Sequence, residues 1–418
     1  MAAQSPEPLV DPVCGMRAQP GTPGYRTMQY QSRRYHFCSP ACLEWFKEDP
    51  RKYLRTGGRL PITDRHIMRT AAQADEAAAG EPQAPTDTSR SSTDDPGSAA
   101  PHPPVPPIFQ RSPANPILTP RDMPVPAAAV LNPGATEHDG DTVLLLRAEN
   151  ATGYSSVYVA RSEDGTSNWR IDAQPLLGHG DPGRPYETWG CEDARVTCVP
   201  EEECWYITYV AYSPMGPAVG LARTRDFVQV ERLGLLGTTN DKDAVLLPRR
   251  FDGRWMILHR PDAAGREHIW ASRSPDLAHW GEAHCVMLEG TGPAWDQVRI
   301  GAGPPPIETE AGWLLIYHGV KAYAGRTIYR AGVALLDRHQ PSRLIARAPG
   351  WIFQAEAPYE LSGLVPNVVF PTGLLLRDGE LHMYYGAADT CVCLATARLD
   401  DVLGTLVETP PPNHASME

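Results

Sequence analysis

The sequence lacks any run of 18 apolar residues and any block of like charges. Without such a run we expect no membrane-spanning helix. Residues 1–10 carry neither a basic segment nor an apolar core, so we expect no secretory signal. Basic residues are in the minority, with 38 Lys and Arg against 50 Asp and Glu and a net charge of −12. This balance argues against a nucleic-acid partner, which would need a basic face.

Cysteine is also sparse, with nine residues scattered over a chain of 418. The number of cysteines is odd and the sequence shows no secretory signal, so we do not expect a disulfide framework. We therefore expect a reducing compartment and a cytoplasmic location. Three cysteines, Cys14, Cys38 and Cys42, cluster near the start of the chain and need a separate explanation.

Composition divides the chain into a front module, a linker, a large domain and a short tail. Residues 9–54 are rich in Cys, Tyr, Phe and Trp. Residues 55–113 consist mostly of Ala, Pro, Ser, Thr, Asp and Gln, and such a segment buries too little to offset its ordering entropy. We expect a disordered linker there. Residues 114–405 alternate apolar and polar residues between turns, and residues 406–418 form the tail.

The large domain contains an internal repeat. Five short strands begin near a glycine or cysteine, and each is followed by a second apolar strand and a polar turn, at a spacing of roughly 50–65 residues. Such a repeat favours a mainly β fold with five radial blades, a five-bladed β-propeller, over a β-sandwich. The repeated strands are 140–147, 204–209, 253–260, 312–318 and 379–385.

Polar side chains gather at the ends of these strands. In a propeller the innermost strands line a central channel, so such side chains converge on the axis. A pocket of arginines, histidines and tyrosines suits a polyhydroxylated or anionic ligand, although the tyrosines could instead pack between blades. The residues are Arg147, Tyr209, His259, Arg260, Tyr317, His318, Tyr384 and Tyr385.

The sharpest local motif is Trp189-Gly-Cys-Glu-Asp-Ala-Arg-Val196. An acidic pair followed by arginine can hold one carboxylate in place beside a guanidinium. The same pattern also occurs in surface turns, where an ion pair of this kind contributes little.

Seven stretches, taken in order, resemble glycoside hydrolase family 130, the mannoside phosphorylases and related β-mannosidases. The resemblance covers residues 114–405 and implies a five-bladed propeller, in agreement with the repeat. The stretches are 192–195, 240–248, 259–261, 299–303, 312–319, 365–371 and 385–390.

The resemblance further implies an inverting phosphorolysis of β-mannosides that gives mannose 1-phosphate. Asp193 matches the general acid, whose proton passes through a substrate hydroxyl to the glycosidic oxygen. Inorganic phosphate, the co-substrate, arrives already ionised and needs no general base. We also expect no catalytic cofactor. An inverting hydrolase would need a second carboxylate to activate water.

The family's binding positions can be carried over residue by residue. Lys242, Arg260, His318 and Tyr329 match its phosphate contacts, and Arg299 matches a further basic position near the pocket. The phosphorylase pattern has Arg at the position of Lys242, and Lys lacks the bidentate fork. A β-1,2-mannosidase that uses water therefore stays open, as does a non-catalytic glycan-binding propeller. The sugar contacts carried over are Asn132, Arg147 and Asp389.

The front module contains Asp11-Pro-Val-Cys-Gly-Met16 and Tyr35-His-Phe-Cys-Ser-Pro-Ala-Cys42. It resembles the YHS domain, a small treble-clef-like α+β module. Thiolates at Cys14, Cys38 and Cys42, with His36 as a candidate fourth ligand, would suit zinc or copper. Free cysteines around an aromatic core are the alternative. The sequence leaves the oligomeric state open, a homo-oligomer included.

Overall fold

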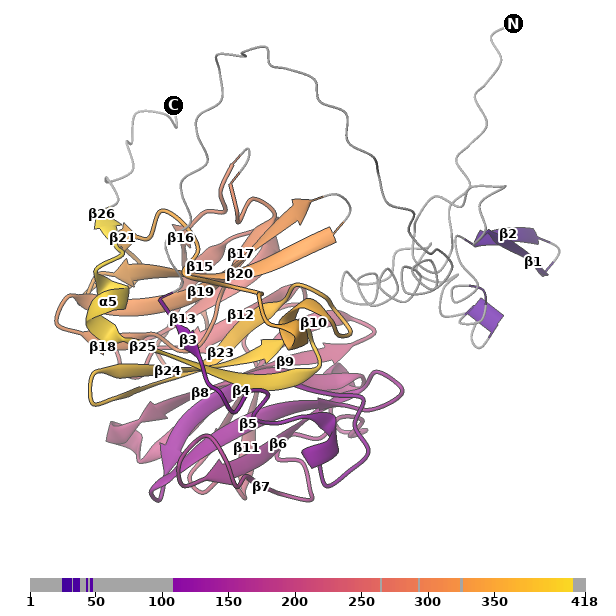
Figure 1. Cartoon of the computed structure of the whole chain (residues 1–418), viewed down its shortest axis with the longest axis horizontal. Helices are drawn as coiled ribbons and strands as arrows, with labels where there is room; N and C mark the ends of the chain where they lie inside the picture. The colour runs from indigo at the N-terminus through magenta and orange to yellow at the C-terminus, as the bar shows by residue number, and fades with distance from the viewer. Residues whose placement is uncertain are drawn as a thin grey trace, which may run out of the picture. The chain divides into compact units, whose positions relative to one another are not determined.

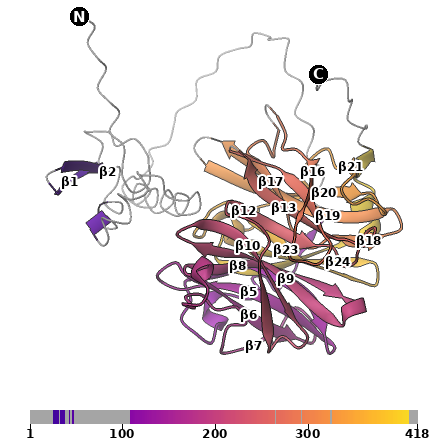
Figure 2. The same ribbon diagram turned by 180° about the vertical axis from the view of Figure 1, so that it is seen from behind.

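The structure is a computed structural model, and it describes residues 25–31, 33–37, 43, 46–47, 108–263, 265–291, 294–323 and 326–408 (Figures 1 and 2). The chain divides into two compact units, Met1–Ala99 and Ala100–Glu418. In the described part of the chain, no helix has the length and apolar character needed to cross a membrane.

The described part of the first unit is a small aromatic core on a hairpin. Strands β1 (Arg26–Tyr30) and β2 (Arg33–Phe37) pair in antiparallel fashion. Phe37 and Phe46 are fully buried, and their ring centroids lie 5.2 Å apart. Tyr25 Oη lies 2.5 Å from His36 Nδ1. The predicted metal ligands Cys14, Cys38 and Cys42 lie outside the described residues.

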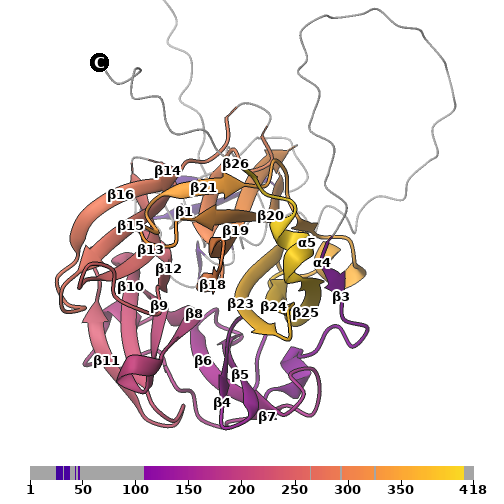
Figure 3. The same ribbon diagram turned by 90° about the vertical axis from the view of Figure 1, so that its left-hand side faces the viewer.

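The second unit is mainly β, as predicted. Its described strands form five four-stranded antiparallel arrays, which follow one another around a common centre in Figure 3. A single parallel bridge, Ser155 to Gly190, joins the first two arrays into one sheet. The first two arrays consist of β4 (Ala129–His138), β5 (Asp141–Glu149), β6 (Ser155–Ser162) and β7 (Arg170–Ile171), then β8 (Gly190–Val199), β9 (Cys204–Ser213), β10 (Gly216–Thr224) and β11 (Val230–Leu235).

The next two arrays carry short extra strands on their edges. The third is β12 (Asp241–Leu246), β13 (Trp255–Ala263), β15 (Ile269–Ser274) and β16 (Gly281–Met287), with β14 (Arg266–Glu267) paired to β13. The fourth is β17 (Arg299–Ala302), β19 (Gly312–Tyr323), β20 (Arg326–Leu336) and β21 (Leu344–Arg347), with β18 (Ile307–Thr309), β22 (Phe353–Gln354) and β26 (Val407–Glu408) beside it.

The fifth array combines the two ends of the unit. It consists of β23 (Val369–Arg377), β24 (Glu380–Ala387), β25 (Cys391–Arg398) and, on its outer edge, β3 (Gln110–Arg111). Short helices complete the unit: η1 (Pro120–Asp122), η2 (Pro185–Glu187), η3 (Pro200–Glu202), α4 (Pro358–Leu361) and α5 (Leu399–Leu403).

Both predicted ends of the large domain differ from the structure. Residues 110–111 were placed in the linker, but they form β3, and Phe109 beside them is buried. Residues 407–408 were placed in the tail, but they form β26, which pairs with β21. Composition hides these short edge strands, because two residues are too few to show an alternating pattern.

Asp-Gly pairs explain why several strands turn back sharply. Asp139-Gly140, Asp252-Gly253 and Asp378-Gly379 each connect an inner strand to the next, and all six residues have positive φ, between 48° and 84°. Two consecutive positive φ angles define the type I′ turn, whose twist matches that of the flanking strands. These turns set the register that brings the opposite strand ends together.

A buried carboxylate anchors β3 to the last array. Glu360 is fully buried and accepts hydrogen bonds from Arg111 Nε at 2.8 Å and Nη2 at 2.9 Å. It also accepts Tyr385 Oη at 2.7 Å and the backbone N–H groups of Glu356 and Ala357 at 2.7 and 2.9 Å. A buried charge with this many partners is costly to disturb.

We expect Glu360→Gln to lower the free energy of unfolding by about 3 kcal/mol, because Arg111 then loses its buried counter-charge. Glu356→Gln is the matched control: it contacts the same arginine, but its side chain is 45% exposed. Its loss should cost at most about 1 kcal/mol. Denaturant unfolding of both variants measures the difference, and equal stabilities would show that Glu360 does not anchor β3.

Candidate active site

Backbone bulges aim the site residues toward one another. Strands β4, β8, β12 and β23 each slip register against their partner, between Leu131 and Gly134 on β4 and at matching places on the others. At three of these bulges a residue other than glycine has positive φ: Asn132 at 48°, Asp193 at 49° and Asp243 at 52°. Bulges re-aim side chains, and strained backbone at a converging point indicates a functional site.

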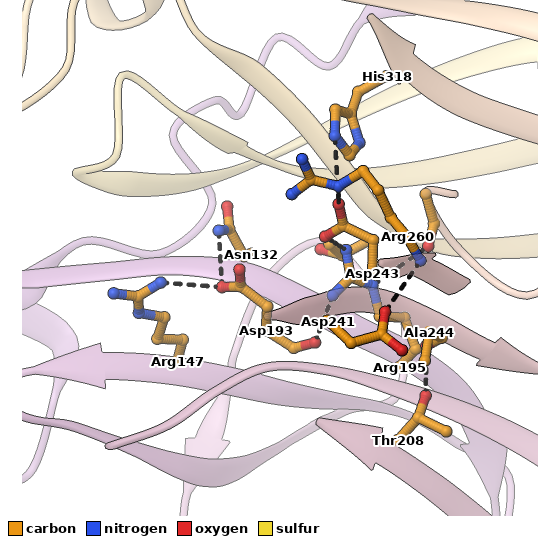
Figure 4. Close-up of polar contacts among 12 residues, drawn as sticks. Asn132, Arg147, Asp193, Arg195, Thr208, Asp241, Asp243, Ala244, Arg260 and His318 are labelled. Carbon is orange, nitrogen blue, oxygen red and sulfur yellow. Dashed lines mark hydrogen bonds and ion pairs between the residues drawn. The ribbon is translucent and has the colours of Figure 1, made fainter. Parts of the chain in front are cut away.

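Asp193 lies at the centre of a first group of polar side chains, the Asp193 group, which includes Asn132 and Arg147 (Figure 4). Its Oδ1 accepts hydrogen bonds from Asn132 Nδ2 at 2.8 Å and from Arg147 Nη1 at 3.1 Å. Arg147 Nη2 also lies 3.1 Å from both Glu149 and Glu192. One guanidinium on β5 therefore holds three carboxylates, and Asp193 itself is only 7% exposed.

The charge state of Asp193 follows from its neighbours. Burial alone would raise its pKa, but Arg147, Arg195 and the Asn132 hydrogen bond outweigh burial and lower it. Burial dominates at Glu192 and raises the pKa of that carboxyl, although Arg147 and Lys242 oppose the rise. Asp193 is thus ionised at neutral pH, and it is the more acidic carboxyl group of the pair.

Asp389 lies in the turn between β24 and β25, with φ of 48°. Burial raises the pKa of Asp389 to about 7. Arg147 opposes this rise, while the negative charges of Asp193, Glu149 and Glu192 add to it. Asp389 therefore carries a proton in a large fraction of molecules at neutral pH, and can donate a hydrogen bond.

Asp243, which sequence analysis did not single out, is the centre of a second group of polar side chains (Figure 4). It accepts hydrogen bonds from Arg260 Nε at 2.6 Å and Arg195 Nη2 at 2.9 Å, and lies 3.4 Å from His318 Nε2. Arg195 Nη1 also donates to the backbone carbonyl of Asp193 at 2.8 Å. Arg195 therefore links the Asp193 group to the Asp243 group.

The remaining basic residues extend the Asp243 group. Arg299 Nη2 donates to Tyr329 Oη at 3.0 Å, and Arg299 Nη1 donates to Glu267 at 3.4 Å. Glu267 also forms an ion pair with Arg260. Lys242 Nζ lies 5.8 Å from the centre of the Tyr212 ring.

Burial decides the protonation of His318 and biases that of Lys242. It lowers the pKa of His318 to about 3, with Asp243 opposing the change and Arg260 adding to it. His318 is thus neutral at physiological pH and can donate or accept a hydrogen bond. Burial also lowers the pKa of Lys242, and the carboxylates of Glu192 and Asp193 oppose that shift.

The structure brings the predicted residues together in two linked groups. Asn132 and Arg147 both donate hydrogen bonds to Asp193, and Asp389 interacts electrostatically with Arg147 and Asp193. The other group comprises Arg260, His318, Arg299 and Tyr329, held by Asp243 and Glu267. Lys242 interacts electrostatically with both groups, through Glu192 and Asp193 on one side and Arg260 on the other.

Several strand-end residues have structural partners instead. Tyr209, Tyr317, Tyr384 and Tyr385 are buried, and their hydroxyls bond to Glu187, Arg347, the Gly165 carbonyl and Glu360. The packing alternative therefore describes these tyrosines. Sequence analysis also missed Asp243, although it lies inside the stretch 240–248, and Glu267, which belongs to no motif.

No group of three or more His, Cys, Asp or Glu residues suited to a metal ion occurs among the residues that the structure describes.

A model of glycoside hydrolase family 130, described as β-1,4-mannooligosaccharide phosphorylase, matches residues 107–408. The chain belongs to this family. A model of the YHS domain matches residues 9–56. Both resemblances drawn from the motifs are thus confirmed.

Two similar relatives are described as phosphorylases. The chain is 35% identical to a β-1,2-mannobiose phosphorylase of Listeria innocua over 61% of its own length and 70% of that protein's. It is 32% identical to a 1,2-β-oligomannan phosphorylase of a Thermoanaerobacter strain, over 66% of its own length and 92% of the relative.

Two solved structures are also similar to this chain. The structure of a Listeria innocua β-1,2-mannobiose phosphorylase in complex with β-1,2-mannobiose matches with a TM-score of 0.65 and 29% identity, covering 71% of this chain and 98% of that one. Another, described with family 130 hydrolases that target β-1,2-mannosidic linkages in Candida mannan, matches with a TM-score of 0.63 and 26% identity, over 72% and 96% of the two chains.

The raised pKa of Asp389 predicts a specific dependence of stability on pH. The folded protein holds this proton more tightly than the unfolded chain, so the contribution is present at low pH and is lost as pH rises from about 4 to about 7. We expect Asp389→Asn to unfold at the same temperature as the unaltered protein near pH 4, but at least about 2 °C higher at pH 8. Calorimetry at both pH values measures this, and a pH-independent difference would contradict it.

Proposed function

We propose that this protein catalyses the inverting phosphorolysis of β-mannosides, giving mannose 1-phosphate. The observation that carries the proposal is the pairing of one hydrogen-bonded carboxylate, Asp193, with a separate cluster of cations built on Asp243. Phosphate needs cations that are oriented in advance and partly removed from water. The similarity to mannoside phosphorylases over most of their length supports the same reaction.

We also propose that the five arrays are the blades of a five-bladed β-propeller, with β3 completing the last blade. The five repeated antiparallel arrays and the likeness to family 130 structures support this architecture. In such a fold the bulges on β4, β8, β12 and β23 would all face the central channel.

In the proposed reaction, Asn132, Arg147 and Asp389 hold the mannosyl group, and Lys242, Arg260, His318, Arg299 and Tyr329 hold phosphate. A phosphate oxygen attacks the anomeric carbon from the face opposite the leaving sugar, and the glycosidic bond breaks as the new bond forms. The leaving oxygen receives a proton that originates on Asp193 and passes through a substrate hydroxyl. The product carries phosphate in the α configuration, because the reaction inverts that centre.

Asp193 must carry a proton when the substrates are bound. The ligand-free protein holds it ionised, through Arg147, Arg195 and Asn132. A bound phosphate dianion adds negative charge beside these cations, and the sugar displaces water, and both changes raise the pKa of a carboxyl group. Substrate binding is therefore coupled to uptake of the proton that the reaction consumes.

Hydrolysis is the second candidate. Lys242 stands where the phosphorylase pattern has arginine, and one structural relative is described with hydrolases of β-1,2-mannosides. Water as nucleophile would require a second carboxylate as general base. Dependence on phosphate separates the two reactions directly.

We expect mannose 1-phosphate to form from β-1,2- or β-1,4-mannobiose only when inorganic phosphate is supplied, and the reverse reaction to release phosphate from mannose 1-phosphate and an acceptor sugar. Chromatography of the products and a phosphate assay measure both directions. Equal release of free mannose with and without phosphate would identify a hydrolase, and no turnover on a panel of β-mannosides would favour a glycan-binding protein.

Asp193→Asn should lower kcat by at least about 100-fold, because the proposed proton source is removed while the hydrogen bonds of a similar side chain remain. The variant should keep its fold and bind phosphate at least as tightly as the unaltered protein, because asparagine needs no proton uptake. Near-normal activity in this variant would rule out Asp193 as the acid.

For the front module we propose that Cys14, Cys38 and Cys42 bind one zinc or copper ion. The clustered cysteines and the match to the YHS domain support this. Protein purified under reducing conditions should contain about one equivalent of metal, as measured by elemental analysis. Replacing the three cysteines by serine should remove the metal and leave the sugar chemistry unchanged. Metal-free protein after growth with added zinc and copper would contradict the proposal.

The cytoplasmic location stays a prediction.

A further inference from the structure

Glu267 lies between two arginines of the proposed phosphate site. It belongs to β14, which pairs with β13 so that Glu267 lies opposite Asp262. One carboxylate oxygen lies 3.4 Å from Arg299 Nη1, and the other forms an ion pair with Arg260. Its side chain is 14% exposed, similar to the 9% and 13% of the arginines. A single carboxylate thus contacts both cations.

Neither arginine depends on Glu267 for its orientation. Arg260 Nε is held by Asp243 at 2.6 Å, and Arg299 Nη2 is held by Tyr329 Oη at 3.0 Å. A guanidinium is planar and rigid, so one well-directed hydrogen bond limits the directions of its remaining N–H groups. What Glu267 adds to the cluster is therefore mainly negative charge.

Asp243 and Glu267 both contact Arg260, but they differ in how easily each carboxylate can move away from it. Asp243 is 2% exposed and contacts Arg195, Arg260 and His318, so moving it would leave buried cations unpaired. Among the described residues, the Glu267 carboxylate contacts only the two arginines. It belongs to a longer side chain than that of Asp243, beside the exposed Gly265 and Arg266. Its carboxylate can rotate away without breaking the scaffold.

We propose that Glu267 is an internal competitor for inorganic phosphate. In the phosphate-free protein it neutralises Arg260 and Arg299, and phosphate binds by displacing its carboxylate from these arginines. This inference rests on the proposed function, because it assumes that phosphate binds to the same two cations. Glu267 then sets the affinity for phosphate and takes no part in proton transfer to the leaving sugar.

The sign of the effect follows from electrostatics. A carboxylate that stays near a bound phosphate dianion repels it, and a carboxylate that leaves gives up its ion pairs, so both routes weaken phosphate binding. Replacing Glu267 by the isosteric, neutral glutamine removes this opposition. An arginine-orienting role for Glu267 would have the reverse effect, because the cations would then lose their arrangement.

The test compares Glu267→Gln with Glu289→Gln. Glu289 is a matched control, since it pairs with Arg266 and His268 beside the same hairpin but contacts neither Arg260 nor Arg299. Calorimetry with inorganic phosphate and steady-state phosphorolysis of a mannobiose provide two independent readouts. We expect Glu267→Gln to lower both Kd and KM for phosphate by about fivefold or more, with the KM for the mannoside unchanged. The control should leave all three values unchanged.

An unchanged or increased phosphate KM in Glu267→Gln would overturn the competitor role, and an increase would identify Glu267 as a positioning residue. In Glu267→Gln the new amide could itself donate a hydrogen bond to phosphate. Glu267→Ala controls for this effect, because alanine removes the negative charge without adding a donor and should also tighten phosphate binding. If the unaltered protein turns over with phosphate but neither variant binds phosphate more tightly, only this inference fails. If no form of the protein binds phosphate, the proposed function fails with it.

Discussion

A fully buried ion pair between Arg195 and Asp243 joins the two halves of the candidate active site. Their side chains are 1% and 2% exposed, so neither charge can rely on water. Arg195 donates a hydrogen bond to the backbone carbonyl of Asp193. Asp243 accepts a hydrogen bond from Arg260 and also contacts His318. The position of the proposed acid is thereby tied to that of the proposed phosphate cations. Such a pair contributes little net stability, and its value lies in fixing a geometry.

The same backbone feature, a β-bulge with one residue at positive φ, occurs on three strands of the site. Asn132, Asp193 and Asp243 occupy equivalent bulges on β4, β8 and β12, each with a left-handed backbone conformation. Asn and Asp tolerate this conformation better than most residues, so the choice of side chain satisfies both the backbone and the chemistry. Repetition of the strand array brings these three positions together without any long catalytic loop.

The sequence alone predicted the β character, the family and most of the residues that the structure brings together at the candidate site. The repeated strands and the seven ordered stretches are local patterns, and local patterns can be read directly from residues. Asp243 was missed because its importance lies in three long-range contacts, to Arg195, Arg260 and His318. Glu267 was missed for the same reason. The strand β3 was assigned to the linker because its two residues pair with a strand far away in the sequence.

That distant pairing also bears on how the protein folds. Arg111 and Glu360 are separated by 249 positions, yet they meet in one salt bridge beside β3 and the last array. During synthesis the segment around Arg111 is made long before its partner strand β25. The sheet edge that β3 covers therefore cannot be completed until β25 has also left the ribosome. Closure of such long loops slows folding, so we infer that the final array assembles after the others.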